Sequence, residues 1–279
     1  MKKHTESLLV YALLVVGAMV MLLPYAWMVS TSLKAQSEVF SYPPQWIPST
    51  PMWQNYVEAW KAAPFPRYFV NSLFVAGLVT LGDLTTGSLA AFAFGRMRFP
   101  GRDALFTLYL ASLMIPHQMT IIPSFLLLRN LSDIDPALGL DTYFALAAPF
   151  MASAFGVFML RQSFMRIPNE LEDAATLDGC GRLGFLTRVV LPLAQPSLAA
   201  LALFAFQGNW NSYLWPLIVT NSDEMRTVQI GLRYFVGQEG GSQWGLLMAA
   251  AVFVSLPMIA LYLFVQKTFT QGIANTGFK

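Results

Sequence analysis

The sequence has little charge and almost none of the residue types that build disulfide, metal or nucleotide sites. Only 11% of its 279 residues are charged, whereas about 25% is usual for a globular domain in water. The single cysteine, Cys180, excludes an internal disulfide framework, and two histidines, His4 and His117, do not predict a His-rich metal site. No glycine-rich phosphate loop followed by Lys-Ser or Lys-Thr occurs. We therefore expect no cofactor or metal to bind this chain, and its net charge of +2 gives no indication of nucleic-acid binding.

Apolar residues make up 56% of the chain and are gathered in long runs. A membrane-spanning helix needs about 20 mainly apolar residues. The run from Leu8 to Val29 exceeds the apolar core of a signal peptide, so we expect it to be retained as a first span. The expected fold is all-α: a multi-pass membrane protein with one transmembrane domain over 1–279. Its predicted spans are 8–30, 69–95, 104–128, 142–165, 189–219 and 245–268.

Lys and Arg are unequally divided between the connections of these spans. With the N-terminus inside, the inner segments carry eleven of them and the outer segments six. Because inner loops are enriched in Lys and Arg, we expect both termini, and the 168–188 connection, to face the cytoplasm. The outer connection, 31–68, is rich in Pro and Trp, which favours a segment lying at the membrane surface; contact with a ligand is the alternative.

The polar segment between Pro168 and Pro192 interrupts two apolar runs and carries four acids. Pro168 disfavours continuation of the preceding helix. Asn169 followed by Glu172 is typical of a capped helix start, and Gly179 is suited to close a helix. We therefore predict a short helix over 169–178, which is either a compact surface that contacts a partner or an ordinary helix of a cytoplasmic loop.

The same segment carries a fixed pattern of residues. Asp173-Ala174-Ala175, then Gly179, then Val189, then Leu191-Pro192 follow the spacing E-A-A-x3-G-x9-I-x-L-P, with Asp for Glu and Val for Ile. This pattern resembles the EAA motif of permease subunits of ABC importers. Nearly the whole chain is similar to the maltose-permease-like inner subunit of carbohydrate importers, with weaker similarity to the glycerol-3-phosphate importer branch. The stretches that carry the resemblance are 30–34, 90–96, 114–123, 151–162 and 210–217.

The resemblance implies a transport subunit that is not itself an enzyme. Helix 169–178 would be a coupling helix seated in a cytoplasmic ATPase. The implied partners are a homologous permease in a heterodimer, two copies of an ABC ATPase that bind ATP and Mg²⁺, and an extracytoplasmic solute-binding protein. The implied location is the bacterial or archaeal cytoplasmic (inner) membrane. The residues implied in coupling are Glu172, Asp173, Ala174, Ala175, Asp178, Gly179, Leu191 and Pro192.

Polar residues inside the predicted spans are candidates for the transport path, because charge within a membrane is costly. Asp83, about 14 residues into the second span, is the clearest candidate. It either lines the path, or is satisfied by a partner subunit or protonated. A polar and aromatic cluster in the fifth span suits sugar recognition, and a helix break or a helix–helix contact is the alternative. The cluster comprises Gln207, Asn209, Trp210, Asn211 and Tyr213. Arg161 and Arg166 are expected to anchor the fourth span at the membrane surface or to pair with the acids of 169–178.

Two other classes of membrane protein explain the sequence less well. A secondary transporter predicts an internal repeat and several ionisable residues inside its spans, and neither is evident. A membrane-embedded enzyme needs converging catalytic groups, which the two histidines, one cysteine and Asp83 do not supply. The solute stays open between sugars and glycerol-3-phosphate or its diesters.

Overall fold

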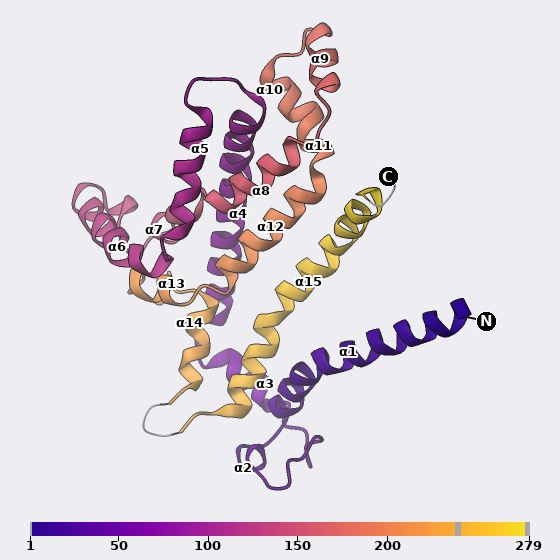
Figure 1. The fold of residues 1–279 in the computed structure, drawn as a ribbon. Coiled ribbons are helices and arrows are strands. Elements are labelled where there is room, and N and C mark those ends of the chain that lie inside the picture. The colour runs from indigo at the N-terminus through magenta and orange to yellow at the C-terminus, as the bar shows by residue number, and fades with distance from the viewer. Residues whose placement is uncertain (1, 238–240, 277–279) are drawn as a thin grey trace. The chain divides into compact units, whose positions relative to one another are not determined.

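The structure is a computed structural model in which residues 2–237 and 241–276 are described (Figure 1). Within these residues there are helices joined by turns and no strand, which confirms the all-α prediction. The chain divides into two compact units. One comprises Met1–Phe65 and Gly231–Pro257, and the other comprises Pro66–Ile230 and Met258–Lys279.

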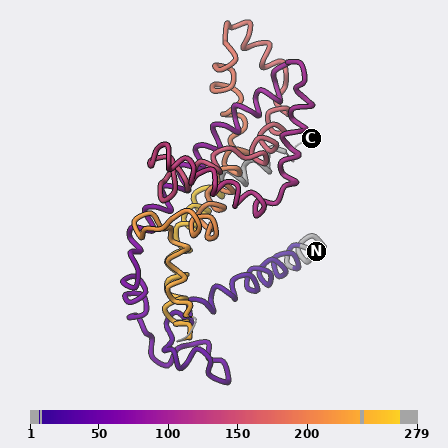
Figure 2. The backbone as a smooth tube through the Cα atoms, turned by 90° about the vertical axis from the view of Figure 1, so that its left-hand side faces the viewer, coloured from indigo at the N-terminus to yellow at the C-terminus, as the bar shows by residue number. Residues whose placement is uncertain are grey.

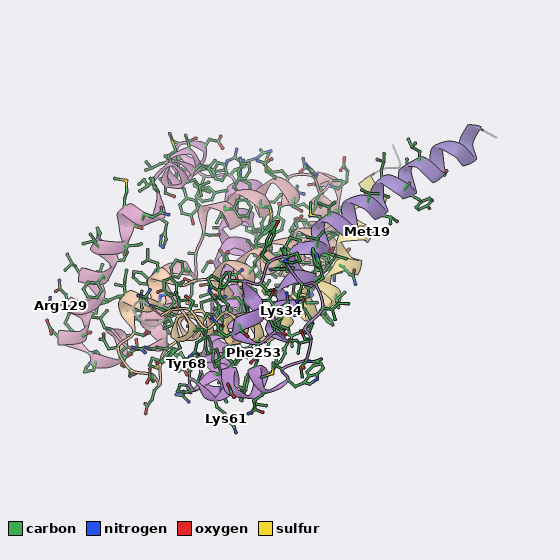
Figure 3. The ribbon with its side chains drawn as sticks, turned by 90° about the horizontal axis from the view of Figure 1, so that it is seen from below. Met19, Lys34, Lys61, Tyr68, Arg129 and Phe253 are labelled. Atoms are coloured by element: carbon green, nitrogen blue, oxygen red, sulfur yellow. The ribbon has the colours of Figure 1, made fainter. Side chains whose placement is uncertain are left out.

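The first unit is built on a long apolar helix, α1 (Lys2–Ser32), which runs without a break (Figure 2). Side chains along it, such as Met19, project away from the helix (Figure 3) and are exposed, as suits contact with lipid or with another subunit. Shorter helices follow. They are α2 (Gln36–Val39), α3 (Gln54–Lys61), the 3₁₀ turn η5 (Arg233–Phe235) and the first part of α15 (Trp244–Thr276).

Polar contacts join the end of α1 to α3. The Asn55 side-chain amide donates to the carbonyls of Ser32 and Lys34 at 2.8 and 3.0 Å. The Lys34 ammonium lies 4.0 Å from the centre of the Trp27 ring, and its residue is 1% exposed. Burial lowers the pKa of Lys34, although the nearby Glu38 opposes this shift. These contacts satisfy main-chain groups where α1 ends.

The second unit contains α4 (Phe65–Arg96) and the helices that pack around it. The elements after α4 are α5 (Arg102–Ala111), η1 (Ser112–Met114), α6 (His117–Ile134), η2 (Pro136–Leu138), α7 (Tyr143–Ala147), η3 (Ala148–Phe150), α8 (Ala154–Phe164), α9 (Asn169–Leu177), α10 (Arg182–Phe185), the π-helix η4 (Leu186–Val190), α11 (Leu191–Leu193), α12 (Gln195–Trp210), α13 (Leu214–Val219) and α14 (Val228–Leu232). One core of buried apolar residues joins α4, α8 and α12 through Phe92, Leu160 and Leu201.

Four helical segments of the described chain are long and apolar enough to cross a membrane, or six if two bent pairs are each one span. The four are Leu9–Ser32, Phe65–Arg96, Pro136–Phe164 and Trp244–Gln266, which agree with the predictions 8–30, 69–95, 142–165 and 245–268 to within a few residues at most ends. Multiple helical spans were thus predictable from hydropathy.

The predicted segments 104–128 and 189–219 are not continuous helices. The first corresponds to Arg102–Met114 and His117–Ile134, bent by 97°, because Pro116 holds the preceding residue in an extended conformation. The second starts earlier, at Arg182, and bends by 82° before Gln195–Trp210. Pro196 lies in the first turn of α12, where its missing N–H costs nothing, so a new helix begins there. Residues 214–219 form the separate helix α13.

Candidate functional site

The predicted polar helix is present as α9, Asn169–Leu177, one residue shorter than the predicted 169–178. Gly179 follows it with φ +75°, the left-handed conformation that glycine adopts without strain. The Gly179 N–H donates to the carbonyl of Thr176 at 3.0 Å, and the Cys180 N–H to that of Ala175 at 2.8 Å. This pair of bonds is a Schellman motif. The prediction that Gly179 closes the helix is confirmed.

The predicted start of α9 is wrong in its mechanism. Pro168 occupies the N-cap position and no side-chain cap bond forms, so Asn169 is the first helical residue rather than the cap. The Asn169 side-chain oxygen instead accepts from Nη1 of Arg96 at 2.6 Å, and Glu172 lies 3.6 Å from the same nitrogen. A guanidinium is a stronger donor to these oxygens than the main-chain N–H groups of the predicted capping box.

The surface of α9 is open, since none of its nine residues is buried. Asp173 and Ala174 are exposed, whereas Ala175 is partly buried and packs against the core of the second unit. Of these two alanines, only Ala174 is therefore exposed. Leu177 is 89% exposed, a feature missed from sequence. A large apolar side chain held in the open beside Asp173 and Asp178 suits a protein partner.

The C-terminal part of the motif follows α9 through two kinds of helix. α10 passes directly into the π-helix η4, in which Leu186 and Val190 are buried. Leu191 packs partly against the same core, and Pro192 is exposed just before the 82° bend. The Leu191-Pro192 pair therefore lies at a change of helix direction.

A cavity of 550 Å³ lies in the second unit next to Asp83. The Asp83 side chain is buried and accepts two hydrogen bonds from Ser153, from its N–H and its hydroxyl, each at 2.9 Å. The Ser153 hydroxyl in turn accepts from the N–H of Gly156 and so caps α8. A side-chain carbon at Gly156 would approach Asp83 Oδ1 to 3.1 Å, so glycine permits this close packing. Asp83 is satisfied by its own chain.

The polar cluster of the fifth span is divided between the cavity and other surroundings. Asn209 and Tyr213 line the cavity. Gln207 is exposed outside the cavity. Trp210 is buried, and the centre of its ring is stacked 5.9 Å from that of Phe206. The Asn211 side-chain oxygen accepts a hydrogen bond from the Gln229 amide at 3.3 Å. The cavity brings together Asp83, Asn209 and Tyr213 but leaves out the other three predicted residues.

Two cavity residues were not recognised as path candidates in the sequence. His117 and Gln118 open α6 directly after the break at Pro116 and line the cavity. The break itself was the available signal, because a helix that restarts inside a membrane exposes polar groups only where they line a cavity or are covered. Among the described residues that line the cavity, none is Lys or Arg.

The described chain is thus a multi-helix membrane protein with an exposed acidic helix and a mainly apolar cavity that several polar side chains also line. A family model described as the inner membrane component of binding-protein-dependent transport systems matches residues 84–275. The chain belongs to this family. It is a multi-pass permease component of the inner membrane, a transport protein rather than an enzyme.

Relatives and solved structures are similar along nearly the full chain. The sn-glycerol-3-phosphate transport system permease protein UgpE of Yersinia enterocolitica is 36% identical over 274 residues, and that of Escherichia coli O1:K1 is 34% identical, each match covering 95% of both chains. A bacterial ABC transporter that imports the acidic polysaccharide alginate matches with a TM-score of 0.80 and 24% identity, over 96% of this chain and 98% of that one. The alginate transporter in complex with its alginate pentasaccharide-bound periplasmic protein matches with a TM-score of 0.62 and 18% identity, over 95% and 94%. These two show the shared fold.

Proposed function

We propose that this chain forms half of the translocation path of an ATP-driven importer and that α9 is its contact with the cytoplasmic ATPase. The observation that carries this is the form of α9: a closed helix with no buried residue that exposes Leu177 among carboxylates. The residues proposed to couple are Glu172, Asp173, Ala174, Asp178 and Gly179 on α9 and its closing turn. Ala175 and Leu191 hold them to the core, and Pro192 lies at the bend beyond it.

The proposed assembly contains a homologous permease, two copies of an ABC ATPase that carry ATP and Mg²⁺, and an extracytoplasmic solute-binding protein. The names of the relatives, and the alginate transporter bound to its periplasmic protein, support such an assembly. The division of Lys and Arg supports cytoplasmic termini and a position of α9 on the side of the ATPase. The acidic surface of α9 fits a receiving cleft that is basic or lined by a helix N-terminus.

The proposed solute path includes the cavity at Asp83, and its lining favours a neutral polyhydroxylated solute such as a sugar. Gln118 and Asn209 offer amides and Tyr213 an aromatic surface, the groups that bind sugar hydroxyls and ring faces. No lysine or arginine among the described lining residues offers a positive charge to an anionic solute. The second candidate is glycerol-3-phosphate or a diester of it, which the names of the permeases at 34–36% identity favour.

Two measurements test the proposal. Leu177→Glu should abolish co-purification of the ATPase with the chain, because it places a further acid at the centre of the contact. Leu138→Glu, at a leucine of η2 that is 37% exposed, is the control outside α9 and should leave co-purification intact. Full ATPase binding by Leu177→Glu would exclude α9 as the contact. A thermal-shift panel on the cognate solute-binding protein then separates the solutes: stabilisation by glycerol-3-phosphate and by no sugar would reject the neutral solute.

A further inference from the structure

The guanidinium of Arg96, the last residue of α4, is enclosed by the turn that leads into α9. Its Nε donates to the carbonyl of Phe164 at 3.1 Å, and its Nη2 donates to the carbonyl of Ile167. Its Nη1 donates to Asn169 Oδ1 at 2.6 Å and lies 3.6 Å from Glu172 Oε2. One side chain therefore contacts the end of α8, the connecting turn and the first turn of α9.

This arrangement is unlike that of an arginine that merely anchors a span at the membrane surface. An anchoring arginine extends its charged end into water or lipid headgroups. The Arg96 side chain is only 4% exposed. Arg98, two residues later, is exposed, and no hydrogen bond or ion pair of its side chain is found in the described part of the chain. Burying a charge is costly unless it is fully paired, so the partners of Arg96 define a specific site.

A second arginine makes the converse connection. Arg161 of α8 donates through Nε to the carbonyl of Phe94 near the end of α4, at 3.1 Å, and its guanidinium lies 4.1 Å from the centre of the Phe106 ring. Each of the two helices thus sends an arginine to main-chain carbonyls at the end of the other. Arg161 was predicted to be a surface anchor or a partner of the α9 acids. Its side chain is instead mostly buried, at 12% exposed, and its Nη2 lies 3.9 Å from Asp103 Oδ1.

The same pair of helices is joined again at the cavity. Asp83 of α4 accepts from Ser153 at the start of α8, and Thr86 donates to the carbonyl of Met151 at 2.7 Å. Asp83 and Arg96 are thirteen residues apart on one helix, or about 20 Å at 1.5 Å per residue. α4 and α8 are therefore fixed to each other at two levels along α4, with the cavity wall at the first level and α9 at the second.

We infer that Arg96 is a positioning residue for coupling: it fixes α9 to the α4–α8 pair, so that displacement of α9 moves the wall of the Asp83 cavity. This inference rests on the proposed contact between α9 and the ATPase. Arginine is required because its planar fork reaches several acceptors at once, whereas the lysine ammonium is a single point charge.

The test compares Arg96→Gln, Arg96→Lys and the control Arg98→Gln in the assembled transporter in proteoliposomes. The quantity measured is solute imported per ATP hydrolysed. Loss of one charge-assisted hydrogen bond is about tenfold in an equilibrium, so Arg96→Gln should lower this ratio by about tenfold or more. Arg96→Lys should restore it in part, and Arg98→Gln should not change it. An unchanged ratio in Arg96→Gln would overturn the inference.

A spin label on Cys180, the single cysteine of the chain, reports directly on α9. In the full chain bound to cysteine-free partners, Arg96→Gln should increase label mobility, while Arg98→Gln should leave it as in the parent. If Arg96→Gln fails to assemble, the same spectrum from the purified chain decides, and unchanged mobility rejects the positioning role. Loss of ATPase binding in Leu177→Glu together with full coupling in Arg96→Gln would reject this inference alone. Full ATPase binding in Leu177→Glu would instead reject the underlying function.

Discussion

Replacing Gly179 by valine should disconnect ATP hydrolysis from solute import. The main chain at this position has φ +75°, which costs an L-residue about 1–2 kcal/mol and a β-branched residue more. A side-chain carbon there would meet no other atom within 4 Å, so the cost is conformational and not steric. If the strain opens the turn, the two Schellman hydrogen bonds, at 3.0 and 2.8 Å, are lost as well.

The consequence is large because α9 has little else to hold its end. It has nine residues and no buried side chain, and helices below about 12 residues are marginal without tertiary packing. A penalty of about 2 kcal/mol would change the ratio of closed to frayed ends by about 30-fold. We expect import per ATP hydrolysed to fall strongly in Gly179→Val, with the chain still inserted in the membrane. Import and ATPase rates measured in the same proteoliposomes give this ratio.

A graded series separates the backbone explanation from all others. Asparagine adopts the left-handed conformation more readily than alanine, and valine least of all. The import-to-ATP ratio should therefore decrease in the order Gly, Asn, Ala, Val at position 179. Normal coupling in Gly179→Val would refute the reasoning. So would an asparagine variant as defective as the valine variant, since side-chain bulk would then be the cause.

Three further predictions concern the cavity and the first unit. Asn209→Ala should raise the solute concentration needed for half-maximal import, because it removes a cavity amide, while Gln207→Ala, outside the cavity, should not; equal effects would refute the assignment. Asp83→Asn should lower the unfolding free energy by about 1–3 kcal/mol. The two carboxylate oxygens accept from the N–H and the hydroxyl of Ser153, and in asparagine an NH₂ group would replace one of these oxygens and face a donor. Thermal unfolding in detergent checks this, and an unchanged midpoint contradicts it. Asn55→Ala leaves two main-chain carbonyls without their side-chain donor and should lower the same midpoint by several degrees; no shift would show that water replaces the amide.

Local sequence signals predicted α9 well, because its end depends on residues next to one another. The two hydrogen bonds of the closing turn join only groups of Ala175, Thr176, Gly179 and Cys180. Its start was predicted wrongly because the partner of Asn169 is Arg96, 73 residues away. A capping pattern describes what a side chain can accept, and a distant donor in the folded chain decides what it does accept.

Hydropathy located the spans but not their breaks or their polar surfaces. Trp210 and Asn209 are adjacent in sequence, yet one is packed in the core and the other lines the cavity. In a membrane both lipid-facing and buried sides of a helix are apolar, so periodicity does not separate them. Pro116 marked the break before α6. His117 and Gln118 line the cavity because they follow that break, and their residue types alone did not indicate this position.

The π-helix η4 lies inside the motif and affects the direction of α9 as well as the spacing of the motif residues. A π turn holds one residue more than an α turn and is typically found near functional sites. Residues 186–190 lie between Gly179 and Leu191, so the extra residue is part of the interval that separates them. In a regular helix each residue adds about 100° of rotation and 1.5 Å of rise. The number of residues in this interval therefore sets the direction in which the acids of α9 face, relative to the helix that enters the membrane. A one-residue deletion there would turn that acidic face away from its present direction.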